Sequence, residues 1–296
     1  MIKNRHKYYQ PEIDGLRGIS IILVIFYHLN INFFSGGFVG VDVFFVISGY
    51  LITNILTRDL KENKFSLINF FENRARRLIP LLFFIILSVT PFFFFSMSPE
   101  EILSYGNSLI SVIFFISNIF FWKDSGYFSS ASELKPFIHS WSLSIEEQYY
   151  LIYPIYLFVC YKFFVKYNFH VIIIFLIFSF FLCIFFSTSN QYLSFYLLPT
   201  RGWEILLGCS ISIISNKHSW HYKFNLYLRN FFTVTGFLMI IISSILLSKK
   251  NIYPSYSTLI PTLGTVFIII FISSKCLLYK ILSNKLIIFI GLISYS

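Results

Sequence analysis

The chain has 296 residues, of which 56% are hydrophobic and only 12% are charged, and it contains 39 phenylalanines. Its mean hydropathy of +0.73 is typical of a polytopic membrane protein and excludes a soluble domain with one core. The net charge of +10 could suggest nucleic-acid binding. The basic residues lie in short loops between apolar runs, however, so membrane topology explains them better and nucleic acid is not an expected partner.

The N-terminus does not resemble a signal peptide, because MIKNRHKYYQPEIDG lacks an apolar core and a small-residue cleavage site. Its basic residues, Lys3, Arg5 and Lys7, favour a cytoplasmic N-terminus. Apolar runs of about 17 to 25 residues predict helical spans. The candidate spans are 16–34, 38–57, 78–96, 142–161, 171–187, 193–214, 231–248, 257–274 and an unfinished one from 286. We therefore expect an all-α, polytopic transmembrane helical bundle with about nine or ten spans, in a single domain over residues 1–296.

The apolar run 106–122 could either cross the membrane or enter it and return on the same side. Re-entry places more of the basic residues on the cytoplasmic side, so the positive-inside rule favours it. It also places the loop 123–141, with Glu133 and His139, on the outer face. Non-helical backbone at membrane depth is tolerated only where protein or a water-filled cavity covers it, so re-entry implies a cavity.

His28 is unusual because it lies within an otherwise apolar segment, residues 16–34. An ionisable side chain at that depth is costly and is therefore a functional-site candidate. Arg17 lies eleven residues earlier, which on an α-helix is about three turns, or roughly 17 Å along nearly one face. We expect one stripe, charged at its base, that carries an imidazole well inside the membrane. The stripe comprises Asp14, Arg17, Ile21, Val24 and His28.

Three arginines, Arg74, Arg76 and Arg77, lie in ENRARRLIP at the predicted cytoplasmic entrance of the third span. Guanidinium groups there suit phosphate, including the phosphates of a nucleotide-bearing donor, because they form bidentate charge-assisted hydrogen bonds. The same residues could instead anchor the protein to anionic lipid headgroups, and composition alone favours the anchor.

The sequence HSWSLSIEEQYYLIYP, residues 139–154, brings Glu146 and Glu147 together into an apolar helix. Two adjacent carboxylates are costly in lipid unless they face protein or water. Because neighbouring helical residues point about 100° apart, at most one of them is expected to share a site with His28. The alternative is a capped helix start, with Ser142 as the N-cap and one glutamate favoured by the helix dipole. One cap does not explain two charges.

Three further charged residues lie in apolar runs. Arg201 and Glu204 are three residues apart in FYLLPTRGWEILLG, so an internal ion pair is the simplest explanation. Asp42 is a lone carboxylate in GGFVGVDVFFVISGY, whose glycines would let helices approach closely. The four cysteines lie in or beside apolar runs without metal-ligand spacing, so they are expected to pack as free thiols, and no metal site is expected.

Five sequence blocks together resemble the acyltransferase-3 family, the bacterial inner-membrane O-acyltransferases that modify cell-surface glycans. The blocks are EIDGLRGISIILVIFYH (12–28), GGFVGVDVFFVISGYLI (36–52), FFENRARRLIP (70–80), WSLSIEEQYYLIYP (141–154) and LLPTRGWEILLG (197–208). Each block is moderately specific, but their common order on a polytopic chain makes the resemblance strong. The final GLISYS (291–296) looks like the start of the family's closing helix, so we expect a truncated last helix and a domain incomplete at its C-terminus.

The resemblance implies a multi-pass protein of the bacterial inner membrane that transfers an acyl group, usually acetyl, from cytoplasmic acyl-coenzyme A to a glycan hydroxyl. The expected partners are then acyl-CoA, with acetyl-CoA as the co-substrate, a lipid-linked or periplasmic glycan acceptor and membrane lipids, without a tightly bound cofactor. The acceptor could be O-antigen, exopolysaccharide, capsule or peptidoglycan.

The resemblance also assigns roles to individual residues. It marks His28 and Arg17 as essential, and it matches the family's arginine motif and paired acidic residues to Arg74, Arg76, Arg77, Glu146 and Glu147. A neutral imidazole suits deprotonation of a sugar hydroxyl that attacks a thioester, so we interpret His28 as the general base, with covalent acyl-histidine transfer as the variant. The arginines at the cytoplasmic end are expected to hold the coenzyme A phosphates. Further site candidates are Asp14, Asp42, His139, Trp141, Arg201 and Glu204.

Two other functions are compatible with the sequence. A transporter or flippase for a glycolipid or acylated sugar would also carry charges at mid-membrane and clustered arginines. The two halves of the sequence show no matching repeat, which argues against a transporter. A catalytically inactive membrane protein is the other possibility, because the missing C-terminal helix could be needed for folding.

Overall fold

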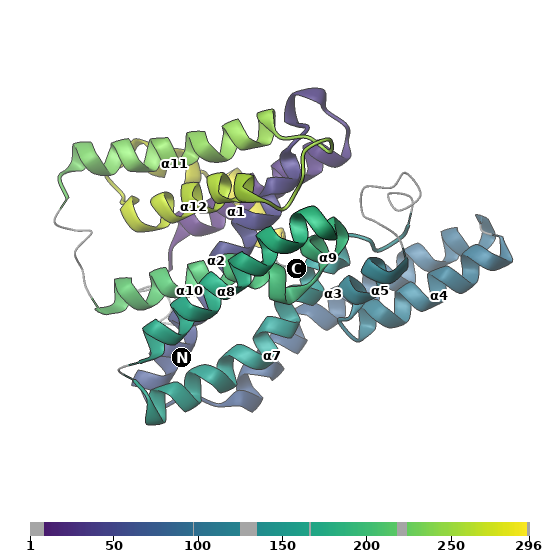
Figure 1. The fold of residues 1–296 in the computed structure, drawn as a ribbon, viewed down its shortest axis with the longest axis horizontal. Helices are drawn as coiled ribbons and strands as arrows, with labels where there is room; N and C mark the ends of the chain where they lie inside the picture. The colour runs from purple at the N-terminus through teal and green to yellow at the C-terminus, as the bar shows by residue number, and fades with distance from the viewer. Residues whose placement is uncertain (1–8, 97, 125–134, 166, 218–223, 295–296) are drawn as a thin grey trace. The chain divides into compact units, whose positions relative to one another are not determined.

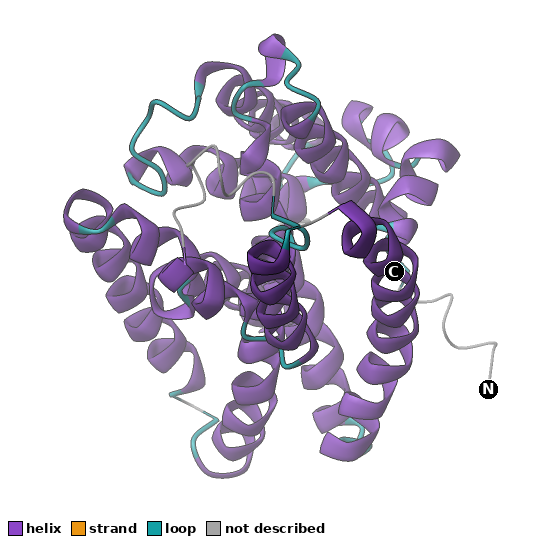
Figure 2. Ribbon diagram, turned by 90° about the vertical axis from the view of Figure 1, so that its right-hand side faces the viewer, coloured by secondary structure: helices purple, strands orange, loops and turns teal. Residues whose placement is uncertain are grey.

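The computed structural model describes residues 9–96, 98–124, 135–165, 167–217 and 224–294. Within these ranges every regular element is a helix (Figure 2), so the all-α prediction is confirmed. The longer helices, labelled in Figure 1, are α1 (Pro11–His28), α2 (Gly40–Lys61), α3 (Leu67–Ser96), α4 (Pro99–Ile113), α7 (Ser140–Phe163), α8 (Asn168–Ser189), α10 (Leu198–Lys217), α11 (Leu226–Leu246) and α12 (Leu259–Phe271). The shorter ones are η2 (Asn32–Phe34), η3 (Gly37–Val39), α5 (Ser117–Asp124), α9 (Gln191–Tyr196), η5 (Tyr256–Thr258), α13 (Leu277–Leu282) and α14 (Lys285–Ile293).

Five segments of the described chain are long and apolar enough to cross a membrane, which makes this a multi-pass membrane protein. They are Gly37–Lys61, Leu67–Phe95, Asn168–Ser189, Gln191–Ser215 and Leu226–Leu246. The sequence predicted about nine or ten spans. The difference lies in helices that are shorter or more polar than a standard span. The predicted span 257–274, for example, contains the 13-residue α12, and the one from 286 contains the nine-residue α14.

The chain divides into two compact units. The first unit holds the residues up to Asn54 together with those from Glu204 to Tyr295, and the second holds Ile55–Trp203. Both boundaries fall inside helices, one in α2 and one in α10, so each of these helices contributes residues to both units.

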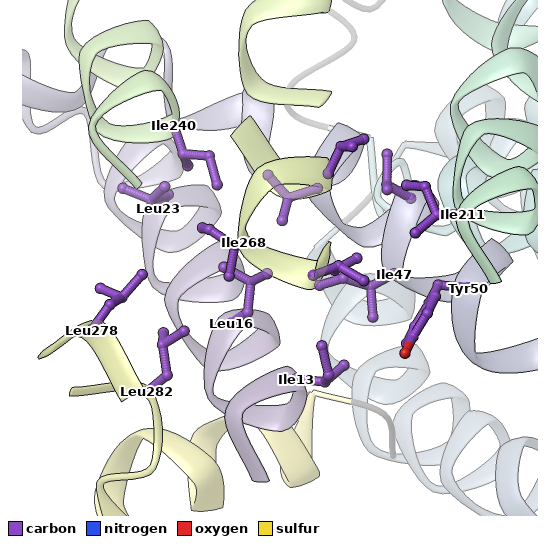
Figure 3. Packing of buried hydrophobic residues seen from close by; sticks show 14 residues of the cluster. Ile13, Leu16, Leu23, Ile47, Tyr50, Ile211, Ile240, Ile268, Leu278 and Leu282 are labelled. Atoms are coloured by element: carbon purple, nitrogen blue, oxygen red, sulfur yellow. The ribbon is translucent and has the colours of Figure 1, made fainter. Parts of the chain in front are cut away.

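The hydrophobic core of the first unit combines helices that are far apart in the sequence. Figure 3 shows Leu16 of α1, Ile47 of α2 and Ile268 of α12 packed in one cluster with Ile240 of α11 and Leu282 of α13. All five side chains are at most 1% exposed. Because lipid is as apolar as leucine, close packing rather than removal from water stabilises such a core in a membrane.

Glycines near Asp42 allow neighbouring helices to approach to backbone contact, as the sequence predicted. Gly37 and Gly40 lie against the backbone of α1, and Gly49 of α2 lies against the backbone of α10. Gly208 makes the reciprocal contact from α10 to α2. A side chain at any of these positions would overlap a carbonyl group of the neighbouring helix, so the close crossing depends on glycine.

We predict that Gly208→Ala destabilises the protein, whereas Gly106→Ala does not. A β-carbon at Gly208 would overlap the carbonyl oxygen of Val46, and overpacking of a close contact costs about 1–3 kcal/mol. Nothing lies within 4 Å of the equivalent position at Gly106 in α4, where alanine should stabilise the helix by up to about 1 kcal/mol. Thermal unfolding in nanodiscs measures both effects. Equal unfolding temperatures for G208A and the wild type would show that the α2–α10 crossing does not need this glycine.

The run 106–122 is not one continuous helix. Helix α4 ends at Ile113, α5 begins at Ser117, and Phe115 between them has a left-handed φ of 53°. Side chains of α7 cover this break. The Gln148 amide nitrogen donates to the carbonyl of Phe115 at 2.9 Å, and the Ser144 hydroxyl accepts from the amide of Ser117 at 3.3 Å. A broken helix at membrane depth requires such protein cover.

Contacts within the first unit, combined with the predicted span in α7, favour re-entry of this run over a crossing. The amide of Gly36, between α1 and α2, donates to the carbonyl of Ser244 at 2.9 Å, and the Ser35 hydroxyl donates to the carbonyl of Leu247 at 2.9 Å. The α1–α2 connection and the connection after α11 therefore lie on the same side of a membrane. If α7 crosses as the sequence predicts, in addition to the five spans that contain α2, α3, α8, α10 and α11, six crossings return the chain to that side. An additional crossing by 106–122 would place the two connections on opposite sides.

We predict that cysteines at Leu29 and Lys250 are labelled from the same side of the membrane, and a cysteine at Lys61 from the opposite side. All three positions are exposed. The native thiols are free and buried, so they should contribute little background. A membrane-impermeant maleimide applied to intact cells and to inverted vesicles makes the measurement. Labelling of Lys250→Cys and Lys61→Cys from one side would mean that 106–122 crosses.

Candidate functional site

The structure corrects the expected position of His28. Helix α1 ends at His28, and the chain turns at Leu29 and Asn30 instead of continuing as a helix to Phe34. Asn30 has a left-handed φ of 54°, a conformation that asparagine adopts more readily than most residues and that ends a helix. His28 is exposed at this end rather than enclosed at mid-span. Neighbouring helices therefore do not enclose this residue.

Arg17 lies near the middle of α1 and is only 6% exposed. Its guanidinium carbon lies 5.9 Å from the ring centroid of Phe44 in α2. Ile21 and Val24, which follow Arg17 toward His28, are partly exposed. The predicted stripe is present on α1, but the arginine is its most buried member and the histidine is its most exposed one.

Asp42 is fully buried at the start of α2 and accepts a hydrogen bond from the hydroxyl of Tyr253. The Tyr253 ring packs against Phe38 with 4.6 Å between centroids, and Phe38 packs against Tyr27 at 5.3 Å. Tyr27 in turn lies 4.9 Å from the ring of His28. A continuous series of contacts thus joins the buried carboxylate to the exposed histidine.

Sequence reasoning missed the three aromatic members of this series, Tyr27, Phe38 and Tyr253. A chain with 20 tyrosines and 39 phenylalanines offers no local signal that distinguishes them. Only the contact between the segment after α11 and the start of α2 reveals their position.

A pocket of about 340 Å³ lies at the other end of α1. Its polar lining includes Tyr9, Gln10, Tyr50, Ser215, Arg229 and Ser273. Arg229 is 9% exposed and donates to the carbonyls of Phe271 at 3.0 Å and Ile272 at 2.9 Å. These carbonyls end α12, where the helix dipole favours a cation. The pocket therefore has a fixed guanidinium in its wall.

In the second unit, Arg74 of α3 and Glu147 of α7 form an ion pair. The Arg74 Nη2 and Nε atoms donate to Glu147 Oε1 at 2.7 and 3.1 Å, and the two side chains are only 12% and 14% exposed. The guanidinium also stacks on Tyr150, 3.6 Å from the ring centroid. The Tyr150 hydroxyl donates to Glu146 Oε2 at 3.3 Å. The arginine motif and the paired glutamates meet here, and the two glutamates contact different partners.

The three arginines do not form one cluster. Arg74 turns toward α7, whereas Arg76 pairs with Glu72 at 2.6 Å and is 76% exposed. Arg77 is exposed as well. An exposed pair one helical turn apart is worth only about 0.3–0.5 kcal/mol, so an incoming phosphate could displace Glu72. The poorly exposed pair of Arg74 with Glu147 is a much weaker candidate for phosphate binding, because that guanidinium already has a carboxylate.

Helix α7 does not begin with Ser142 as its N-cap. The helix begins at Ser140, so His139 occupies the N-cap position, and it makes no side-chain cap. Ser142 is not the N-cap, because it lies inside the first turn, where its hydroxyl donates to the His139 carbonyl at 3.4 Å. Glu146 and Glu147 are therefore too far into the helix to be explained by a cap. Nearby protein atoms desolvate the imidazole of His139 and lower its pKa, although the residue as a whole is exposed.

Arg201, at the start of α10, is fully buried against aromatic rings. Its guanidinium carbon lies 5.8 Å from the centroid of Trp141 and 5.7 Å from that of Phe195. Desolvated cation–π contacts of this kind stabilise a buried arginine. Two predicted site residues, Trp141 and Arg201, are thus brought together. Glu204 is also fully buried, and its ion pair with Arg201 stays a prediction.

The loop 123–141, which was predicted to face outward, is described only in part. Glu133 lies outside the described residues, as does the rest of 125–134.

The fold and these charged residues define a helical membrane protein with an exposed histidine at one helix end. Residues 10–296 match the model of the acyltransferase-3 family, which is described as an acyltransferase domain. The chain belongs to this family, and the resemblance that rested on five sequence blocks is confirmed.

Curated relatives are O-acetyltransferases by name. The chain is 33% identical to the O-acetyltransferase OatA of Staphylococcus aureus over 299 residues, which cover 97% of this chain and 49% of the relative. It is 44% identical to the peptidoglycan O-acetyltransferase OatA of Listeria monocytogenes over 156 residues, 52% of this chain and 25% of the relative. It is 35% identical to the putative peptidoglycan O-acetyltransferase YrhL of Bacillus subtilis over 222 residues, which cover 72% of this chain and 34% of the relative. The chain thus spans half or less of the length of these relatives. No solved structure is significantly similar.

We predict that Glu147→Gln lowers stability more than Glu146→Gln. The first change leaves the poorly exposed Arg74 guanidinium without a charged acceptor, and charged hydrogen bonds contribute about 1.5–3 kcal/mol each. The second removes the acceptor of one 3.3 Å bond from Tyr150, which contributes about 1 kcal/mol or less. Thermal unfolding of both variants measures the difference.

The double variant Arg74→Gln with Glu147→Gln serves as the control. It should recover part of the loss, because no uncompensated charge stays buried. Equal losses for Glu146→Gln and Glu147→Gln would show that the ion pair contributes nothing specific.

Proposed function

We propose that the chain is the membrane domain of an O-acetyltransferase, which transfers an acetyl group from cytoplasmic acetyl-coenzyme A to a hydroxyl of a cell-surface glycan. The observation that carries this proposal is the exposed imidazole of His28 at the end of α1, fixed by contact with Tyr27. Family membership supports acyl transfer, and the names of the relatives favour a peptidoglycan-type acceptor. Membership in an acyltransferase family also argues against the transporter or flippase alternative.

His28 acts as the general base in this proposal. The imidazole removes the proton of the acceptor hydroxyl as its oxygen attacks the thioester carbonyl carbon. The carbon–sulfur bond then breaks, coenzyme A leaves as the thiolate, and the imidazolium returns its proton. A histidine at a helix end suits this role better than one at mid-span, because a polymeric acceptor can reach it without entering the bilayer.

The donor enters from the opposite end of α1. The helix has 18 residues, so its ends are about 27 Å apart, and the pocket lined by Arg229 lies at the end remote from His28. A cytoplasmic N-terminus would place that pocket on the cytoplasmic side. Arg17 lies between the two ends and provides a positive charge along the path of the donor. In the second unit, considered by itself, the family's arginine motif and the exposure of Arg76 and Arg77 make these two residues our candidates for binding the donor phosphates.

We predict that His28→Ala lowers acetyl transfer at least about 100-fold, the usual contribution of a general base, while binding of acetyl-CoA is retained. The protein in nanodiscs is supplied with labelled acetyl-CoA and cell-wall glycan fragments, and transfer and donor binding are measured separately. His170→Ala, an exposed histidine in α8, is the matched control and should behave as the wild type. Near-normal transfer by His28→Ala would rule out the general-base assignment.

A further inference from the structure

We propose that a lysine pair beside His28, Lys249 and Lys250, binds an anionic group of the acceptor and thereby determines which glycans are acylated. The group is a carboxylate or a phosphate carried by the glycan. This inference rests on the proposed function and specifies the acceptor side of the same site.

The lysine pair lies next to the proposed base. The Lys249 Nζ atom is 5.4 Å from the ring centroid of Tyr27, and that ring is 4.9 Å from the ring of His28. The ammonium group is therefore within about 10 Å of the imidazole. A sugar whose hydroxyl meets His28 can place a charged substituent of the same or the next sugar at this lysine.

The segment that carries the lysines is held in place on both sides. Before them, the carbonyl of Leu247 accepts the Ser35 hydroxyl at 2.9 Å. Across them, Asn251 Oδ1 accepts from the amide and the hydroxyl of Ser248 at 2.8 and 3.0 Å, which closes a turn. A recognition group on a preorganised turn loses less conformational entropy on binding than one on a free loop.

The next residues fix the turn to the helix bundle. The Tyr253 hydroxyl donates to the buried carboxylate of Asp42, and both residues are at most 1% exposed. Asp42 therefore does not lie at the surface, where it could neutralise the lysines. Lys249 and Lys250 are both exposed, and in the described part of the chain Lys250 forms no hydrogen bond or ion pair.

Two lysines on the outer side of a membrane protein are unusual, and a topology with a cytoplasmic N-terminus places Lys249 and Lys250 there. The hydrogen bonds that join the α1–α2 connection to the segment after α11 place Lys249 and Lys250 on the same side as His28. With a cytoplasmic N-terminus that side is the outer one, where the positive-inside rule disfavours basic residues. A specific anionic partner explains their presence there, and compact ammonium groups suit both carboxylate and phosphate.

The experiment compares the wild type with the double variant Lys249→Gln and Lys250→Gln. The acceptors are one glycan fragment with a free carboxylate, the same fragment with that carboxylate amidated, and a phosphorylated fragment. We expect KM for the charged fragments to rise about threefold to tenfold in the variant, as loss of two exposed charge contacts allows. The kcat, KM for acetyl-CoA and KM for the amidated fragment should change less than twofold.

Two further variants separate charge from structure. Lys249→Arg with Lys250→Arg keeps both charges and should retain most of the affinity for the charged fragments. Lys280→Gln with Lys285→Gln removes two exposed lysines elsewhere in the same unit and should leave KM unchanged. The wild-type KM for charged fragments should also rise with salt, and that of the glutamine variant should not.

Each other outcome overturns the inference. An equal rise of KM for charged and amidated fragments, or no rise for either, means that the lysines do not bind the anionic group of the acceptor. A rise seen only in nanodiscs with anionic lipid, and absent in zwitterionic ones, assigns the lysines to lipid headgroups. Wild-type protein that transfers acetyl to none of the fragments contradicts the proposed function itself, and the inference falls with it.

Discussion

A polar group inside a bilayer has no water to bind, so the protein must supply its partner, and the arrangement of this chain depends on that constraint. Arg74 binds Glu147, and Asp42 binds Tyr253, in each case through helices or loops distant in the sequence. The backbone break at Phe115 is covered by side chains of α7 in the same way. Each such contact requires two parts of the chain to lie side by side.

Helix α1 connects the chemistry proposed for the two faces of the membrane. Its first turn borders a polar pocket, a buried arginine lies near its middle, and an exposed histidine ends it. The glycine contacts that bring α2 against α1 keep this helix in close contact with the rest of the first unit. In the proposed function, a donor and an acceptor on opposite sides share this one helix as their common path.

The segment after α11 carries the lysine pair that we propose to select the acceptor. Tyr253 packs through Phe38 and Tyr27 to His28, and Lys249 lies over the ring of Tyr27. The proposed base and the proposed acceptor-binding charge thus contact the same aromatic series.

Properties that act along a single helix could be predicted from the sequence, because residues a few positions apart obey the geometry of one helix. Apolar runs indicated an all-α membrane bundle, the 100° rotation predicted different surroundings for Glu146 and Glu147, and the glycines near Asp42 indicated close packing. The end of α1 was misplaced because Leu29, Ile31, Phe33 and Phe34 extend the apolar run, although Asn30 and Asn32 interrupt it. What only the tertiary structure decided is the partner of each charge, since the pair Arg74 and Glu147 is separated by 73 positions and the pair Asp42 and Tyr253 by 211. No local pattern records a contact over such separations, because it depends on how whole helices pack.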